Sequence, residues 1–115
     1  MGIDHSSRSI LNVDLIPEPN MGNELESVAK IVRDGEDCDV VVDFSSVDII
    51  TSSNIAKLLK LNKALNNVGR RLVLCSLPNA TKQIFTLAGL DQVFDFADDK
   101  SAALSMVKNA QHVKS

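Results

Sequence analysis

Three consecutive hydroxyl residues, Thr51, Ser52 and Ser53, stand where an apolar run meets a helix-like run in the segment IITSSNIAKLL. A hydroxyl just before a helix accepts a hydrogen bond from an unpaired backbone N–H, which stabilises the helix by about 1 kcal/mol. One hydroxyl is enough for that. The start of a helix also favours added negative charge by roughly 0.3–1 kcal/mol, so a phosphoryl group fits there. The pattern alone favours a cap and leaves phosphorylation open.

Other reactive residue types do not form a recognised catalytic or metal-binding pattern. The two histidines, His5 and His112, lie near the chain ends, and there is no GxSxG motif to support a serine hydrolase. The two cysteines, Cys38 and Cys75, are far apart and form no CxxC pair, which argues against zinc. Phosphate-binding GxxxxGK[ST] and GxGxxG loops are missing from the sequence. We therefore predict no catalysis, no cofactor and no metal.

An aspartate near the end of a buried strand offers a different chemistry. Asp43 follows an apolar run and could accept phosphate as the aspartate of a two-component receiver does. That reaction needs Mg²⁺, an acidic pair and usually a lysine. Asp14 and Glu18 form an imperfect pair, and the later strand ends in Ser76 without a lysine. The receiver interpretation is therefore the weaker alternative.

Composition limits the possible partners and compartments. The chain of 115 residues predicts one domain over residues 1–115, with residues 1–8 and 111–115 frayed. Twelve basic against fifteen acidic residues give a net charge of −3, which argues against nucleic acid as a partner. The sequence has no run of about 18 apolar residues and no signal-peptide pattern, so we expect no membrane contact. Unpaired cysteines suit a reducing environment, and the predicted location is cytoplasmic.

Hydrophobic periodicity predicts strands that alternate with helices, an order typical of a mostly parallel sheet. Helices on one face or on both faces are compatible with this order. A short apolar run rich in β-branched residues, as in residues 40–44, is typical of a strand buried on both faces. Asn20 is placed to cap the first helix. The predicted strands cover residues 9–16, 40–44, 71–77 and 93–96, and the predicted helices cover 21–32, 55–68, 78–88 and the segment from 98 onward.

Several short motifs follow one another over roughly residues 39–107, namely Asp43-Phe44-Ser45, Val47, Ile49-Ile50, Ser52-Ser53, Gly69, Gly89-Leu90 and Phe94. This ordered set resembles the STAS domain, and in particular the anti-sigma factor antagonists of bacteria. The resemblance implies an α/β fold with a small mixed, mostly parallel β-sheet and helices packed largely on one face. A first strand would have to come from the segment MGIDHSSRS.

The resemblance implies a protein-binding switch. An antagonist of this family binds an anti-sigma factor that is also a serine kinase, and the sigma factor is released. Phosphorylation of the first serine of an Asp-Ser-Ser-Gly motif breaks the complex, and a serine phosphatase restores it. Carried over, the acceptor is Ser52, with Thr51 as the alternative. The implied partner-binding residues are Glu18, Thr51, Ser52, Ser53, Asn54 and Lys57.

Two positions depart from the family motif. Thr51 stands where the family has Asp, and Asn54 stands where it has Gly. The first change removes a carboxylate beside the acceptor, and the second adds bulk where a partner approaches. These departures support a second hypothesis. In it the chain is a constitutive scaffold or interaction module of a signalling assembly, and its hydroxyls only cap a helix.

Overall fold

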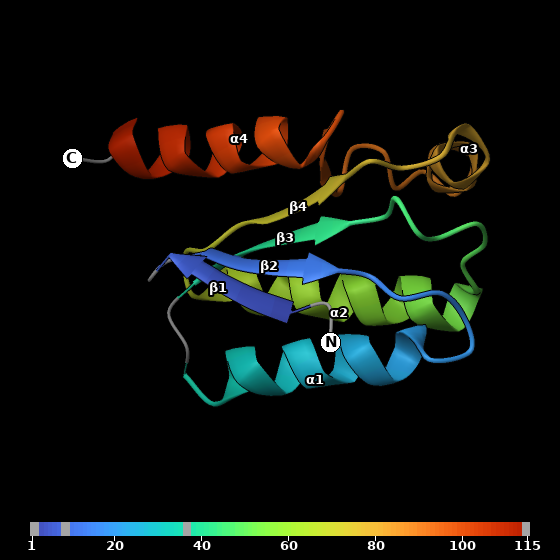
Figure 1. Ribbon diagram of the computed structural model, residues 1–115, viewed down its shortest axis with the longest axis horizontal. Coiled ribbons are helices and arrows are strands. Elements are labelled where there is room, and N and C mark those ends of the chain that lie inside the picture. The colour runs from blue at the N-terminus through green and yellow to red at the C-terminus, as the bar shows by residue number, and fades with distance from the viewer. Residues whose placement is uncertain (1–2, 8–9, 36–37, 114–115) are drawn as a thin grey trace.

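The computed structural model describes residues 3–7, 10–35 and 38–113, and these form one mixed sheet with helices on both of its faces (Figure 1). The strands are β1 (Ile3–Ser7), β2 (Ile10–Asp14), β3 (Asp39–Asp43), β4 (Leu72–Cys75) and β5 (Asp95–Ala97). The helices are α1 (Met21–Arg33), α2 (Ser52–Asn67), α3 (Asn79–Leu87) and α4 (Lys100–Val113).

The sheet has the order β1-β2-β3-β4-β5, with β2 to β5 parallel and β1 antiparallel to β2. The central strand β3 is buried along its whole length, as its continuous run of β-branched residues predicts. Its register places Asp43 beside Asp14 of β2 and beside Cys75 of β4. The carboxyl ends of β2, β3 and β4 therefore lie side by side at one end of the sheet. The predicted mostly parallel α/β fold is confirmed.

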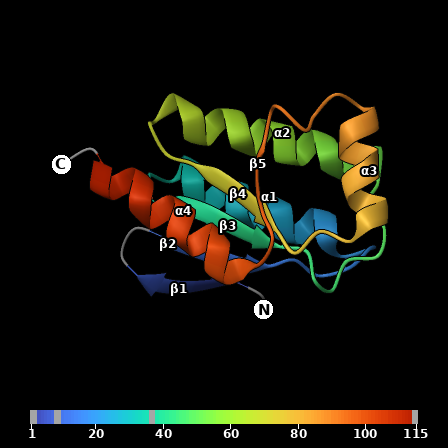
Figure 2. The same ribbon diagram turned by 90° about the horizontal axis from the view of Figure 1, so that it is seen from above.

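Alternate residues of β3 enter two different cores. Val40 and Val42 join the larger core, which also holds apolar residues of α1, α2 and α3. Val41 joins a smaller core, in which Ala103 and Val107 of α4 pack against the sheet. Figures 1 and 2 show α4 on the opposite side of the sheet from α1 and α2. Most of the helical packing is thus on one face, as predicted, and α4 covers the other face.

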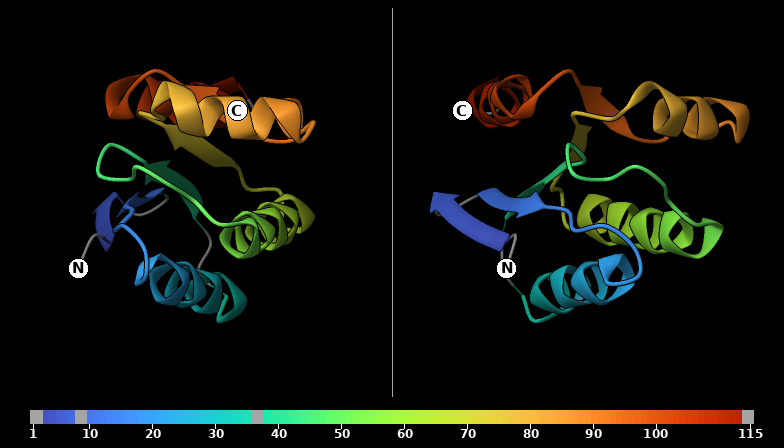
Figure 3. Two further views of the ribbon diagram at one scale, coloured as in Figure 1. Left: turned by 90° about the vertical axis from the view of Figure 1, so that its right-hand side faces the viewer. Right: turned by 45° about the vertical axis from the view of Figure 1, so that its right-hand side comes forward.

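Four phenylalanines close the larger core near the carboxyl ends of the strands. Phe85 of α3 meets Phe44, Phe94 and Phe96 edge to face, with ring centroids 5.6–6.4 Å apart. Figure 3 places α3 beyond the ends of the strands, on the side where α2 begins. These contacts fix the loops that enter α2 and α3, so the polar residues on those loops lie on a packed base.

The ends of the chain differ from the sequence-based prediction of frayed segments at 1–8 and 111–115. Residues 3–7 form β1, whose backbone pairs with the outer edge of β2, and residues 111–113 continue α4. An edge strand has unpaired N–H and C=O groups, and a neighbouring strand satisfies them. Residues 1–2, 8, 114 and 115 lie outside the described residues. The single domain over 1–115 stays a prediction.

Three local details differ from what the sequence patterns suggest, and one of them is an element boundary. Asn20 stands at the predicted N-cap position of α1, but its backbone is helical and its side chain makes no cap hydrogen bond. The last strand starts at residue 95 and not 93, because the N–H groups of Val93 and Phe94 turn back to the Leu90 carbonyl. The strand-like run Ile49-Ile50 is a loop.

Candidate interaction site at the start of α2

The first of the three hydroxyl residues caps α2. Thr51 has extended backbone angles, and its Oγ1 accepts a hydrogen bond from the Asn54 N–H at 3.3 Å. This is the geometry of an N-cap, and one hydroxyl satisfies it. Ser52 and Ser53 are the first residues of the helix itself, and both are exposed. The tertiary structure therefore separates one capping hydroxyl from two that face solvent.

A carboxylate from a distant part of the sequence lies against this cap. Glu18, on the loop between β2 and α1, accepts hydrogen bonds through Oε2 from Asn54 Nδ2 at 2.6 Å and from the Thr51 N–H at 3.4 Å. Negative charge is favourable at a helix N-terminus, where backbone N–H groups are unpaired. Glu18 supplies a carboxylate to the site although the motif itself carries Thr51 in place of aspartate.

Asn54 joins α1 to α2 at this point. Its side chain is only 5% exposed, and a Cβ added at Gly22 would lie 3.0 Å from Asn54 Oδ1. A side chain at position 22 would therefore push against the amide, so the close approach of α1 to α2 depends on glycine. Lys57, one turn further along α2, pairs with Glu26 of α1 at 3.4 Å. Asn54, which stands where the family has glycine, thus contacts Glu18 and lies close against Gly22.

All six partner-binding residues predicted from the sequence lie at this end of α2 or on the loop against it. Glu18 and Asn54 touch directly, Thr51 caps the helix, and Ser52 and Ser53 form its exposed rim. Lys57 lies beside Gly22 on the flank of the helix.

Sequence analysis missed one apolar residue beside the site. Ile49 lies two residues before Thr51 and its side chain is 64% exposed, whereas Ile50 is buried. The pair resembles part of a strand in sequence. In the structure the chain turns before it, where the Val47 N–H donates to the Phe44 carbonyl at 2.9 Å, and the loop leaves Ile49 outside the core. Ile49 therefore places one exposed apolar side chain close in sequence to the polar start of α2.

A second polar cluster lies at the carboxyl end of β3. Asp43 Oδ1 accepts hydrogen bonds from the N–H and the hydroxyl of Ser45, and Oδ2 accepts one from the Ser76 hydroxyl at 3.2 Å. The Cys75 thiol lies 3.9 Å from the same Oδ2. Ser76 has a φ of +60°, an uncommon backbone conformation for a residue other than glycine.

The charges around Asp43 follow from these contacts. Burial opposes ionisation, but the hydrogen bonds from Ser45 and Ser76 outweigh it, and the pKa of Asp43 lies below its ordinary value. Burial, and then the Asp43 charge, raise the pKa of Cys75 to about 11, so the thiol is protonated at neutral pH. The hydrogen bond to Asp14 raises the pKa of Lys100.

A receiver-like site needs a lysine near the aspartate, and sequence analysis found none at the end of the later strand. In the structure, Lys100 lies near Asp43. It comes from the start of α4 and not from the end of β4, so only the fold brings it to this edge. Both oxygens of Asp43 are nevertheless engaged by neighbours, and the residue is only 7% exposed. No group of three potential metal-ligating side chains occurs among the described residues. The cluster therefore acts as a structural tie between β3, β4 and the following loops.

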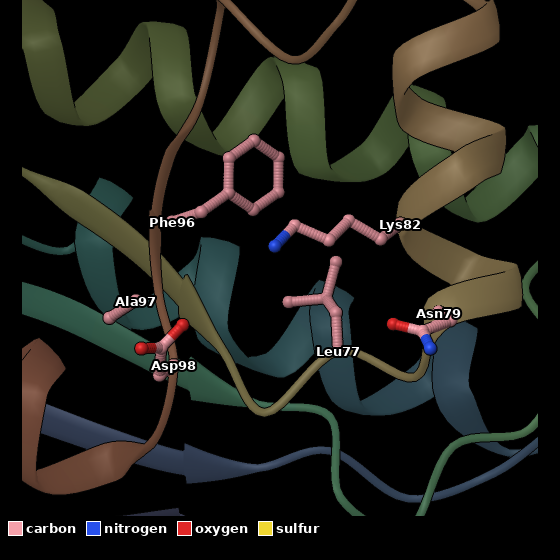
Figure 4. A pocket seen from close by; sticks show the side chains of 6 residues that line it. All are labelled: Leu77, Asn79, Lys82, Phe96, Ala97 and Asp98. Carbon is pink, nitrogen blue, oxygen red and sulfur yellow. The ribbon is translucent and has the colours of Figure 1, made fainter.

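A small cavity of about 230 Å³ lies at the carboxyl ends of β4 and β5, beside the start of α3 (Figure 4). Leu77 and Phe96 form apolar walls, and Lys82 and Asp98 bring opposite charges. In Figure 4 the Lys82 amine extends toward Phe96. None of the partner-binding residues predicted from the sequence lines this cavity.

Over the parts of the chain that the structure describes, every helix is too short or too polar to cross a bilayer. Ser52 presents an exposed hydroxyl at the start of α2, beside the residues Thr51 and Asn54 that contact Glu18.

Comparison with known proteins connects this chain to one family. A family model described as the STAS domain matches residues 20–103. BtrV of Bordetella bronchiseptica, a candidate anti-sigma factor antagonist, is 32% identical over 71 residues, and the match spans 62% of this chain and 61% of that relative. The chain thus aligns with about three fifths of the length of this relative.

Solved structures share the fold at low identity. RsbS from Moorella thermoacetica superposes with a TM-score of 0.81 and 17% identity, over 96% of each chain. The phosphorylated form of SpoIIAA, a cell fate determinant of Bacillus, has a TM-score of 0.72 and 16% identity, over 91% of this chain and 96% of that one. At such low sequence identities, the structural similarity shows that the fold is shared and nothing more.

Proposed function

This chain belongs to the STAS domain family, and on that premise we propose that it is an anti-sigma factor antagonist that acts by partner switching. Membership confirms the resemblance inferred from the ordered motifs, and the family is a non-enzymatic one. The proposed partner is an anti-sigma factor that is also a serine kinase, with a serine phosphatase as the opposing enzyme. The observation that carries the proposal is an exposed Ser52 beside a cap that Thr51 already provides.

Ser52 is the proposed acceptor because its position combines exposure with a favourable field. Its hydroxyl is not needed as the helix cap, since Thr51 Oγ1 has that role. A phosphoserine carries about −1.5 to −2 charges, and the unpaired N–H groups of the first helical turn stabilise negative charge. The domain can therefore accept the modification without refolding.

Thr51 is a poorer acceptor in this structure. Its hydroxyl accepts from the Asn54 N–H, and its own N–H faces the Glu18 carboxylate at 3.4 Å. A phosphate there would replace the cap and stand close to another negative group. Modification of Ser52 leaves both contacts in place.

The switch follows from what a docked partner would meet. We place the docking surface on Ser52, Ser53 and the exposed Ile49, with Glu18 and Lys57 at its sides. An unmodified surface offers a small hydroxyl beside an apolar anchor, which a partner can cover. A phosphoserine in the same place brings a strongly hydrated anion into the interface, and its desolvation opposes binding.

A constitutive interaction module is the second candidate function, and Asn54 favours it. This residue stands where the family has glycine, and its amide is tied to Glu18 at 2.6 Å. A rigid junction of this kind can serve as a fixed docking point without modification. In that case Ser52 and Ser53 are only the first turn of α2.

Peptide mapping by mass spectrometry tests the acceptor. The protein is isolated from its own cells under stress and at rest, and the peptide covering residues 49–60 is examined. We expect a phosphate on Ser52 whose occupancy changes with condition. A phosphate on Thr51 would keep the mechanism and move the acceptor. Full coverage of the peptide without phosphate in either condition would contradict the switch and favour the constitutive module.

Variants at the same position test the consequence. Ser52→Asp should weaken binding to the purified anti-sigma factor kinase by about a hundredfold while the thermal melt stays nearly unchanged. Ser52→Ala is the matched control and should bind as the unmodified protein does. Equal binding of both variants would overturn partner switching.

A further inference from the structure

A groove of about 290 Å³ lies between α1 and α2 and is lined by residues of both helices. Its floor is apolar, with Leu25 and Ala29 from α1 and Leu61 and Ala64 from α2. The two leucines are nearly buried, whereas the two alanines are partly exposed. Small residues on two neighbouring helices leave room for a third helix to approach closely. The shape of the groove therefore suits a helical segment.

The walls of the groove are cationic. Arg33, Lys57 and Lys60 line it, and the single acidic lining residue, Glu26, is already paired with Lys57. Arg33 and Lys60 are exposed and make no ion pair with any other residue that the structure describes. The groove thus presents two exposed positive charges that have no acidic partner in the described structure.

This positive charge is concentrated on an otherwise acidic molecule. Helix α2 carries Lys57, Lys60 and Lys63, and it has no Asp or Glu between residues 52 and 67. The rest of the chain then has 12 − 3 = 9 basic against 15 acidic residues, a net charge of −6. Helix α2 is thus a basic element on a chain whose remaining residues are acidic on balance, and this favours an acidic ligand over a basic one at the groove.

The groove is continuous with the proposed docking surface. Lys57 belongs to both, and it lies beside Gly22, where α1 comes closest to Asn54. A partner that covers Ser52 at the start of α2 can extend along the two helices without leaving the surface, because α1 and α2 lie side by side (Figures 1 and 3).

We propose that the α1–α2 groove binds an acidic amphipathic helix of the protein partner. The helix would place apolar residues at i, i+4 and i+7 over Ala29 and Ala64, with Asp or Glu on its flanks beside Arg33 and Lys60. This inference rests on the proposed function, because it extends the same interface. It assigns a second contact whose chemistry differs from that of the Ser52 surface.

The groove is tested with a defined probe. The probe is a synthetic amphipathic helix of about 18 residues, with leucine and alanine on one face and glutamate on both flanks. The control peptide has lysine at each glutamate position. The ¹⁵N-labelled full chain is titrated with each peptide and followed by NMR. We expect saturable shifts over residues 25–33 and 57–64 with the acidic peptide only. No saturable shift, shifts confined to other surfaces, or equal binding of the basic peptide would each overturn the proposal.

Charge reversal inside and outside the groove sharpens the test. Lys60→Glu should weaken the acidic peptide about tenfold, whereas Lys63→Glu, the same change on the same helix but outside the groove lining, should change it by less than about twofold. Equal loss in both variants would mean that net charge alone drives binding, and the groove would be rejected. Thermal melts of both variants check that the fold is intact.

The same probe separates this inference from partner switching. Ser52→Asp should bind the acidic peptide within about twofold of the unmodified protein, because the peptide occupies the groove and not the Ser52 surface. If Ser52→Asp no longer binds the anti-sigma factor kinase but still binds the acidic peptide, both proposals are supported. Retained kinase binding overturns the switch but not the groove, and failed peptide binding overturns the groove but not the switch.

Discussion

The two polar clusters beyond the carboxyl ends of the strands use similar groups in opposite ways. At the end of β3, the Asp43 carboxylate accepts hydrogen bonds from the Ser45 N–H and from the hydroxyls of Ser45 and Ser76, and the residue is 7% exposed. At the start of α2, the Glu18 carboxylate receives the amide of Asn54, Thr51 caps the helix, and Ser52 and Ser53 remain exposed. The first cluster ties the fold together, and the second has groups left for a partner.

The two clusters contain similar residue types, and they differ in whether the polar side chains already have hydrogen-bond partners within the fold. Asp43 resembles a phospho-acceptor in sequence, yet both its oxygens have partners in the structure, so a ligand there would have to displace them. The hydroxyl of Ser52 is displayed on a helix end whose cap is supplied by its neighbour. A polar residue is available for function when the fold does not require its hydrogen bonds.

The largest expected effect is the loss of the Asp43 carboxylate. Asp43→Ala leaves the Ser45 N–H and the Ser76 hydroxyl without their acceptor, and we expect the free energy of unfolding to fall by about 3 kcal/mol. Urea denaturation measures it. Asp48→Ala, at an exposed aspartate, is the control and should change stability by less than about 0.5 kcal/mol. Equal effects would show that the Asp43 cluster is not a structural tie.

A smaller loss is expected at the junction of α1 and α2. Asn54→Ala removes a buried amide that donates to the Glu18 carboxylate, and it should lower the free energy of unfolding by about 1.5 kcal/mol. A double-mutant cycle with Glu18→Ala isolates the pair, and we expect the two losses to be less than additive. Additive losses would contradict the direct contact.

The three hydroxyls can be ranked by single substitutions. Thr51→Ala should lower the free energy of unfolding by about 1 kcal/mol because the cap of α2 is lost, whereas Ser52→Ala should change it by less than about 0.5 kcal/mol. Chemical denaturation of the two variants gives the comparison. A larger loss for Ser52→Ala would mean that Ser52 is the cap, and it would weaken the case for its role as an acceptor.

The smallest expected effect is on how the free energy of unfolding changes with pH. Because the pKa of Asp43 is lower in the folded than in the unfolded chain, its charge stabilises the fold fully above the unfolded pKa of about 3.9. That contribution is lost as the pH falls through the lower folded pKa. The stability difference between the unmodified protein and Asp43→Asn should therefore shrink as the pH is lowered from 6 toward about 3. A difference that stays constant over this range would contradict the assigned pKa direction.

Local patterns predicted the main elements and the family, but not every residue's environment. Helical spacing placed the helices to within a few residues, and the β-branched run at Val40–Val42 predicted a fully buried strand. The same local information did not show that Ile49 lies in an exposed loop, or that the Asn20 side chain makes no cap hydrogen bond. These details were missed because a loop residue's exposure depends on how the chain turns, and similar sequences permit several turns.

The sequence by itself determined the alternation of strands and helices, the hydroxyl cluster at residues 51–53 and the ordered motifs of the STAS family. Only the tertiary structure decided that Thr51 caps the helix, that Glu18 and Asn54 meet across 36 positions, and that Lys100 reaches the edge near Asp43. Periodicity and caps are local properties, encoded over a few residues. Contacts between distant segments depend on the register of the sheet and on which face each helix covers, and those are settled by the packing of the whole core.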